Sequence, residues 1–210
     1  MVRTRPKGQS DIRDINDGGR GWSWDGRYGH ESLPIPTARL GLWLFLGAVT
    51  MMFAAFTSAY LVRLPMPDWR TIPKPPILWL NTILLLVSSG VGQWAWSSIR
   101  KDDRSSLRWG LVLTTLLGIA FLLGQMAAWR QLISAGVYLQ TNPASSFFYL
   151  LTAVHGFHLL GGLIALLWTT YRAWRGDYTR WSHLGVELSI VYWHFLTIVW
   201  LWVFALLHLR

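Results

Sequence analysis

The 210-residue sequence contains no cysteine. This absence excludes disulfides, zinc–thiolate sites, iron–sulfur clusters and catalysis by a thiol. Acidic residues are also scarce, with ten Asp and Glu against 19 Lys and Arg. No Ser–His–Asp triad, P-loop or dinucleotide-binding fingerprint is present either. The sequence therefore offers no convincing active site of its own.

What the sequence does contain is five uncharged, largely apolar stretches: Leu40–Leu61, Ile77–Ile99, Trp109–Trp129, Phe147–Tyr171 and Leu188–Leu209. Roughly 20 helical residues, rising ~1.5 Å each, cross ~30 Å of hydrocarbon. The stretches lack strict alternation and are too long for barrel strands, which excludes a closed β-barrel. The sequence predicts an all-α integral membrane bundle of five transmembrane helices, formed by residues 37–210.

The net charge of +9 is unevenly distributed. If the N-terminus is cytoplasmic, 14 of the 19 basic residues fall on the cytoplasmic side and five on the other. This asymmetry follows the positive-inside rule, so we predict a cytoplasmic N-terminus and a periplasmic C-terminus. It also argues for a membrane rather than a nucleic acid as the partner of the positive charge. Residues 1–36, which are basic and glycine-rich, are expected to form a disordered cytoplasmic tail.

Glu187 lies three residues into the last apolar run, and no other acid lies inside a membrane-length segment. His194 follows seven residues later. Seven residues are close to two helical turns, so the two side chains should project from nearly the same face. A carboxylate in hydrocarbon is costly and marks a candidate functional site. Its donor is expected from His183, one turn earlier, or from another helix. A hydrogen bond that holds the last helix in place and a proton-collecting role both remain open.

Three further polar side chains lie inside the predicted helices. His155 and His158 project about 60° apart from the fourth helix, and His194 falls at a similar depth. We expect them to form a polar layer with interhelical hydrogen bonds, or a site linked to lipid or protons. Gln125 is expected to bond to a neighbouring helix. One haem held by His194 with His155 or His158 remains an alternative, whereas a single Glu inside the predicted helices does not suit a carboxylate-bridged metal pair.

Several stretches together resemble subunit III of the haem–copper cytochrome c oxidases. They are L-W-L-N-T-I-L-L-L-V-S-S-G from Leu78, F-L-L-G-Q from Phe121, F-F-Y-L-L-T-A-V-H-G-F-H-L-L-G-G from Phe147, and H-L-G-V-E-L-S-I-V-Y-W-H-F-L-T-I-V-W from His183. The last is the most specific, because its His, Glu, Tyr-Trp-His-Phe and later Trp all fall at the family's spacing. The resemblance covers roughly residues 38 to 208 and matches the five-helix bacterial form.

The resemblance implies a non-catalytic subunit of an oxidoreductase complex in the bacterial inner (plasma) membrane. Such a subunit binds no cofactor and packs beside catalytic subunit I, with subunit II in the same complex and haem and copper in those partners. It supports assembly, lipid binding and proton uptake. Structural phospholipid is expected, with Arg39, Arg63 and Arg172 near helix ends as headgroup candidates.

The sequence also departs from the family pattern. Gly47-Ala48, Ala128 and Thr197 stand where longer members carry acids, which leaves Glu187 as the candidate for a proton-linked role. Two other functions stay open: a subunit III-like accessory protein of a nitric-oxide reductase, and a haem-b or quinone-binding membrane anchor of another respiratory complex.

Overall fold

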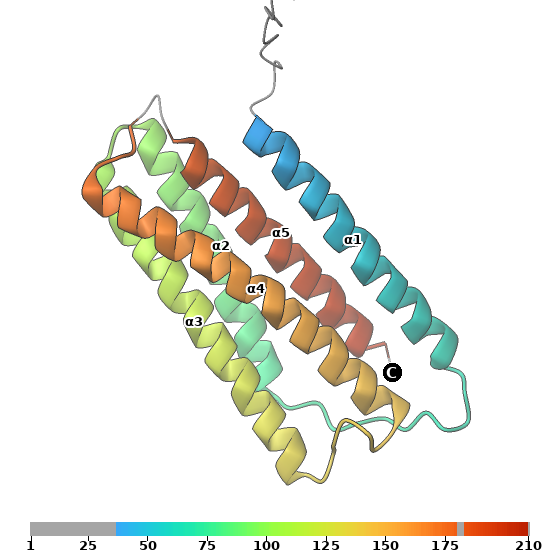
Figure 1. Cartoon of the computed structure of the whole chain (residues 1–210). Coiled ribbons are helices and arrows are strands. Elements are labelled where there is room, and N and C mark those ends of the chain that lie inside the picture. The colour runs from blue at the N-terminus through green and yellow to red at the C-terminus, as the bar shows by residue number, and fades with distance from the viewer. Residues whose placement is uncertain (1–36, 180–182, 210) are drawn as a thin grey trace, which may run out of the picture. The chain divides into compact units, whose positions relative to one another are not determined.

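The structure, a computed structural model, describes residues 37–179 and 183–209. These residues form five helices: α1 Thr37–Arg63, α2 Ile77–Arg100, α3 Arg104–Ser134, α4 Pro143–Arg175 and α5 Leu184–Leu207 (Figure 1). Each is long and apolar enough to cross a membrane. The predicted all-α bundle of five transmembrane helices is therefore confirmed. The tail predicted for residues 1–36 lies outside the described residues.

Polar caps set the helix ends beyond the apolar stretches. α3 begins at Arg104 because the Asp103 side chain accepts a hydrogen bond from the Ser106 backbone nitrogen, at 3.1 Å. The hydrogen bonds from Ser106, chiefly the one from its side chain, hold the pKa of Asp103 below its usual value. α4 begins with a capping box between Asn142 and Ser145. It ends at Gly176, whose φ of 82° favours glycine.

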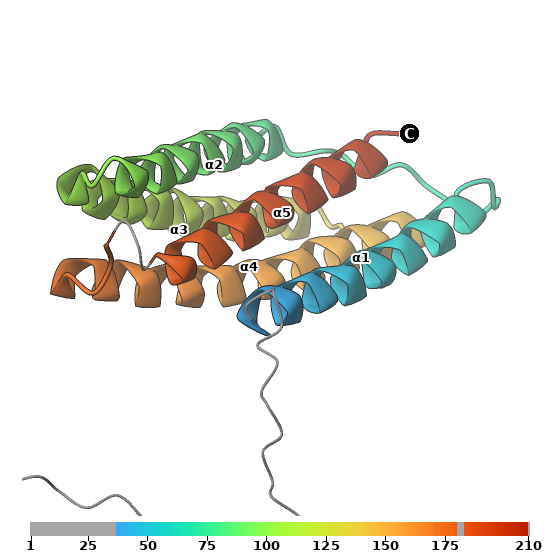
Figure 2. The same ribbon diagram turned by 90° about the horizontal axis from the view of Figure 1, so that it is seen from above.

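α2, α3, α4 and α5 form a closed four-helix ring, in which each helix contacts the next and α5 contacts α2. Successive helices run in opposite directions, as short connections between neighbouring membrane helices require (Figure 1). α1 lies outside the ring and, among the described helices, contacts only α4 and α5. Figure 2 shows α1 and α2 on opposite sides of α5.

Two tryptophans of α5, Trp193 and Trp200, fill the centre of the ring. Trp193 lies where α3 and α4 expose glycine backbone: a Cβ added to Gly118 would lie 2.6 Å from its ring, and one added to Gly162 would lie 3.3 Å away. Small residues thus allow the helices to approach closely around a large side chain. This packing fixes the rotation of α5 and therefore the direction in which its polar residues point.

Candidate functional site in the membrane bundle

The Glu187 carboxylate is paired with Arg39 of α1. The distance from Arg39 Nη2 to Glu187 Oε2 is 2.7 Å, and both residues belong to the first turns of their helices. The donor is therefore the arginine of another helix and not His183, which lies at the N-cap of α5. His183 Nδ1 is buried and has no hydrogen-bond partner among the described residues.

His194 joins α5 to α2. Its Nδ1 contacts the hydroxyl of Ser89, and its Nε2 lies 3.0 Å from Gln93 Oε1. The neutral tautomer with its proton on Nε2 satisfies both contacts, because Ser89 then donates to Nδ1 and Nε2–H donates to Gln93. Ser89 and Gln93 were not among the site residues predicted from the sequence. Their spacing of four residues, which places both on one face of α2, is the signal that marks them.

His155 is completely buried in the ring. Its imidazole packs between Phe121, at a centroid distance of 6.0 Å, and Trp200, at 5.2 Å. Neither ring nitrogen has a hydrogen-bond partner among the described residues. His155 therefore behaves as an aromatic core residue here, with two unpaired polar atoms.

His158 faces α1 instead. Its ring lies 6.3 Å from Phe45 and 6.1 Å from Phe53, and its Nδ1 is 2.8 Å from the carbonyl oxygen of Val154. The hydroxyl of Tyr192 donates to the backbone oxygen of His158. The three histidines thus meet three different sets of neighbours rather than forming one polar layer, and this arrangement does not suit a haem held between α4 and α5.

Gln125 is buried on α3, and neither polar atom of its amide has a partner among the described residues. We expected Gln125 to form a hydrogen bond to a neighbouring helix, but no such bond is present among the described residues. Its stem lines a hollow of about 280 Å³ between α3 and α4, together with Trp129 and Thr152. In that hollow the interhelical bond comes from Trp129, whose Nε1 donates to Thr152 Oγ1 at 3.1 Å.

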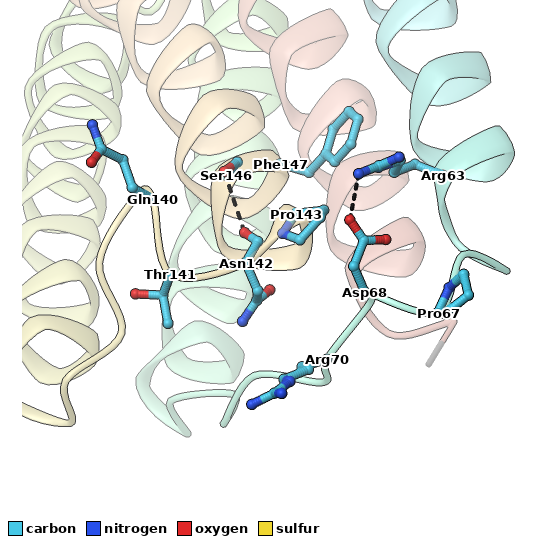
Figure 3. A pocket seen from close by; sticks show the side chains of 10 residues that line it. All are labelled: Arg63, Pro67, Asp68, Arg70, Gln140, Thr141, Asn142, Pro143, Ser146 and Phe147. Atoms are coloured by element: carbon cyan, nitrogen blue, oxygen red, sulfur yellow. Dashed lines mark hydrogen bonds and ion pairs between the residues drawn. The ribbon is translucent and has the colours of Figure 1, made fainter.

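Arg63 borders a polar hollow of about 760 Å³ at the end of the bundle where α1 ends and α4 begins. The loops between α1 and α2 and between α3 and α4 enclose it (Figure 3). Arg63 forms an ion pair with Asp68, which also lines the hollow, and Arg70 lines another part of it. The hollow therefore presents two guanidinium groups and one carboxylate.

Arg172 lies near the opposite end, in the last turn of α4. Its Nε is 3.1 Å from Asp177 Oδ2, and its guanidinium carbon lies 5.5 Å from the ring centroid of Tyr178. Burial raises the pKa of the Tyr178 hydroxyl, while the positive charge of Arg172 opposes this rise. All three arginines proposed as headgroup ligands thus already have an acidic partner.

The described residues contain no group of three or more His, Asp or Glu side chains that could hold a metal ion. Apart from the contact of His158 with Val154 inside α4, the side-chain polar contacts above join one helix to another or link a helix end to its loop. Chemically, this arrangement can stabilise a bundle and bind ions or headgroups at its ends.

Residues 27–209 match the family model described as "Cytochrome c oxidase subunit III". The chain is also similar to cytochrome c oxidase subunit 3 of Synechocystis sp., with 37% identity over 190 residues, which are 88% of this chain and 78% of the relative. The subunit 3 of Thermostichus vulcanus is 33% identical over 81% of this chain and 86% of its own length. That of Bacillus sp. (strain PS3) is 28% identical over 81% of this chain and 84% of its own length.

The chain belongs to the cytochrome c oxidase subunit III family. This confirms the resemblance found in the sequence and makes the chain an accessory subunit of a haem–copper oxidase and a multi-pass membrane protein. The three relatives all carry the name of the oxidase subunit. The comparisons therefore do not favour a nitric-oxide reductase protein or a haem-b or quinone anchor.

Proposed function

We propose that this chain packs beside catalytic subunit I of a cytochrome c oxidase in a bacterial inner membrane, with subunit II in the same complex. Haem and copper belong to those partners, and this chain supports assembly, lipid binding and proton uptake without a cofactor. The family match over residues 27–209 carries the proposal. The bundle supports the absence of a cofactor from this chain, because the centre of the four-helix ring is filled by the tryptophans of α5.

The ends of the bundle support a role at the membrane surface. Arg39 and Glu187 place a charged pair at one end, and Arg63 and Arg70 line the hollow at the other. Guanidinium groups bind phosphate through charge-assisted hydrogen bonds. We therefore assign the hollow in Figure 3 as a phospholipid headgroup site with Arg63 as its first ligand. Arg39 and Arg172, at the opposite end of the bundle, are candidates for binding other headgroups there.

Purification of the tagged chain in mild detergent tests the proposal. Mass spectrometry is expected to identify subunits I and II, and the absorbance spectrum of the complex is expected to show a Soret band that the isolated chain lacks. A Soret band that stays with the isolated chain would support the haem-b anchor instead. Co-purification with a nitric-oxide reductase would overturn the choice of complex.

A further inference from the structure

One face of α5 is only partly covered by the described helices: it is half-buried for most of its length and exposed at Ile198. It carries Glu187, Val191, His194 and Ile198, which recur at intervals of four, three and four residues and so form one stripe, here called the α5 stripe. α1 borders one side of it, through the Arg39–Glu187 pair and a hydrogen bond of 3.0 Å from Trp202 to Thr57. α2 borders the other side (Figure 2).

The middle of the α5 stripe is polar. His194 lies about 15 Å along α5 from its start and about 20 Å from its end, at ~1.5 Å per residue, so it falls within the hydrocarbon. Gln93, which accepts its Nε2–H, is exposed on the lipid-facing side, and the Gln93 amide nitrogen has no partner among the described residues. Lipid chains offer no acceptor for such a group, whereas side chains of another helix do.

Beside this polar centre lies an apolar groove of about 530 Å³ between α1 and α5. Its α1 wall includes the small, exposed residues Ala54 and Ser58, and its α5 wall includes Ile198 and Trp202. Small residues at a membrane surface let another helix approach closely. The large side chains of that helix could then pack in the groove. The surface is recessed between α1 and α2, so a single helix complements it better than a second copy of the same recessed face.

We propose that the α5 stripe receives a transmembrane helix of a neighbouring oxidase subunit. That helix places a hydrogen-bond acceptor opposite Gln93 and apolar side chains in the groove beside Ile198. The inference rests on the proposed function for the identity of the complex. It goes further by assigning the face of this chain that makes the contact.

A photo-crosslinking residue placed at Ile198 of the chain in the assembled oxidase tests this directly. Ile164 of α4 is the matched control, because the two isoleucines are exposed to 65% and 67% and both lie inside long helices. The Ile198 probe is expected to crosslink another oxidase subunit, and the Ile164 probe to label lipid. A crosslink from position 198 to lipid alone, or to a second copy of this chain, would overturn the assignment.

Substitutions provide a second measurement on the same complex. Ile198→Trp fills the groove and is expected to lower recovery with a tagged catalytic subunit about tenfold, equivalent to ~1.4 kcal/mol. Gln93→Leu is expected to lower recovery about threefold through the lost interhelical bond. Ile164→Trp should leave recovery unchanged, and membrane levels of each variant check folding. Equal recovery of the two tryptophan variants refutes the inference but not the proposed function, which fails only if the unmodified chain does not co-purify with the oxidase.

Discussion

Arg39 and Glu187, which are 148 residues apart in the sequence, are joined by a hydrogen bond of 2.7 Å between the first turns of α1 and α5. α1 lies outside the four-helix ring and buries only Leu46, Val49, Phe53 and Tyr60. The pair therefore holds the most loosely packed helix at one end. The Arg39 side chain is 42% exposed and that of Glu187 is 21% exposed, so we assign the pair a contribution of about 1–2 kcal/mol.

Substitution of Glu187 separates the two roles that the sequence left open. Glu187→Gln keeps an acceptor for Arg39 but removes the ionisable group, so assembly and turnover are expected to remain nearly intact. Glu187→Leu removes the acceptor and leaves Arg39 unpaired, so association of the chain with the oxidase is expected to weaken. Recovery with the tagged catalytic subunit and the rate of proton uptake are the measurements.

The control for this prediction exchanges the charges. Arg39→Glu combined with Glu187→Arg should restore much of the association that either single reversal removes, because the pair can form again. The structural role is refuted if Glu187→Gln slows proton uptake as much as Glu187→Leu does while both variants assemble normally. A proton-collecting role would then replace it.

The glycines that surround Trp193 give the second prediction. Gly118→Ala places a Cβ 2.6 Å from the Trp193 ring, so we expect a loss of about 1–3 kcal/mol from overpacking. Gly156→Ala is the matched control, because no atom lies within 4 Å of its added Cβ. Alanine should stabilise α4 there by about 0.5–1 kcal/mol. Thermal unfolding of the purified chain in detergent measures both changes, and a shift of the same sign in both variants would contradict the packing argument.

A buried hydroxyl of α2 supports the third prediction. Ser88 Oγ accepts from Trp193 Nε1 and donates to the backbone oxygen of Thr114, both at 3.0 Å. Ser88→Ala leaves the indole nitrogen without a partner and is expected to cost about 1–3 kcal/mol in unfolding free energy. Ser97, whose hydroxyl bonds to the carbonyl oxygen of Trp94 at the exposed surface of α2, is the control. Ser97→Ala should change stability by less than about 0.5 kcal/mol.

His155 gives the fourth prediction. Because both ring nitrogens are buried without a partner among the described residues, His155→Phe keeps an aromatic ring and removes two unpaired polar atoms. We expect unfolding free energy to stay equal or to rise by up to about 2 kcal/mol, with oxidase turnover unchanged. Thermal unfolding and oxygen consumption are the measurements. A loss of turnover in a stable, assembled variant would give His155 a proton-linked role.

Hydropathy predicted the existence and the order of the five helices but not their ends. The third apolar stretch, Trp109–Trp129, became α3 Arg104–Ser134, because apolar residues mark the hydrocarbon whereas caps such as Asp103 end the helix. The sequence also did not predict which side of each helix faces the core of the bundle. Of the glycines in α4, Gly162 packs against Trp193 whereas Gly156 meets open space. Membrane helices are apolar on all sides, so periodicity does not identify the side that faces the core.

The sequence predicted the part of the site that lies on a single helix. Glu187 and His194 lie on one stripe of α5, as their spacing of seven residues predicted. Their partners lie on other helices, so only the packing reveals Arg39, Ser89 and Gln93. Topology already placed the starts of α1 and α5 at the same end of the bundle, a signal that points to Arg39 as the donor for Glu187.

The hollow at the opposite end gives the last prediction. Arg63 and Arg70 line about 760 Å³ there, while Asp68 balances one of the two positive charges (Figure 3). A phosphate headgroup can accept hydrogen bonds from both guanidinium groups, and the apolar surface of α1 next to it can pack along an acyl chain. We expect the gently purified oxidase to retain phospholipid at this position.

Arg63→Ala should lower the amount of phospholipid retained per complex, because Arg63, the last residue of α1, supplies one of the two guanidinium groups that line the hollow. Arg130→Ala is the control, since Arg130 is exposed in the last turns of α3 at the same end but does not line the hollow. Native mass spectrometry in mild detergent counts the bound lipids. Equal lipid counts in the two variants, or the absence of lipid from the unmodified complex, would contradict the headgroup site. Asp68→Asn removes the competing carboxylate of the Arg63 pair and is therefore expected to increase lipid retention.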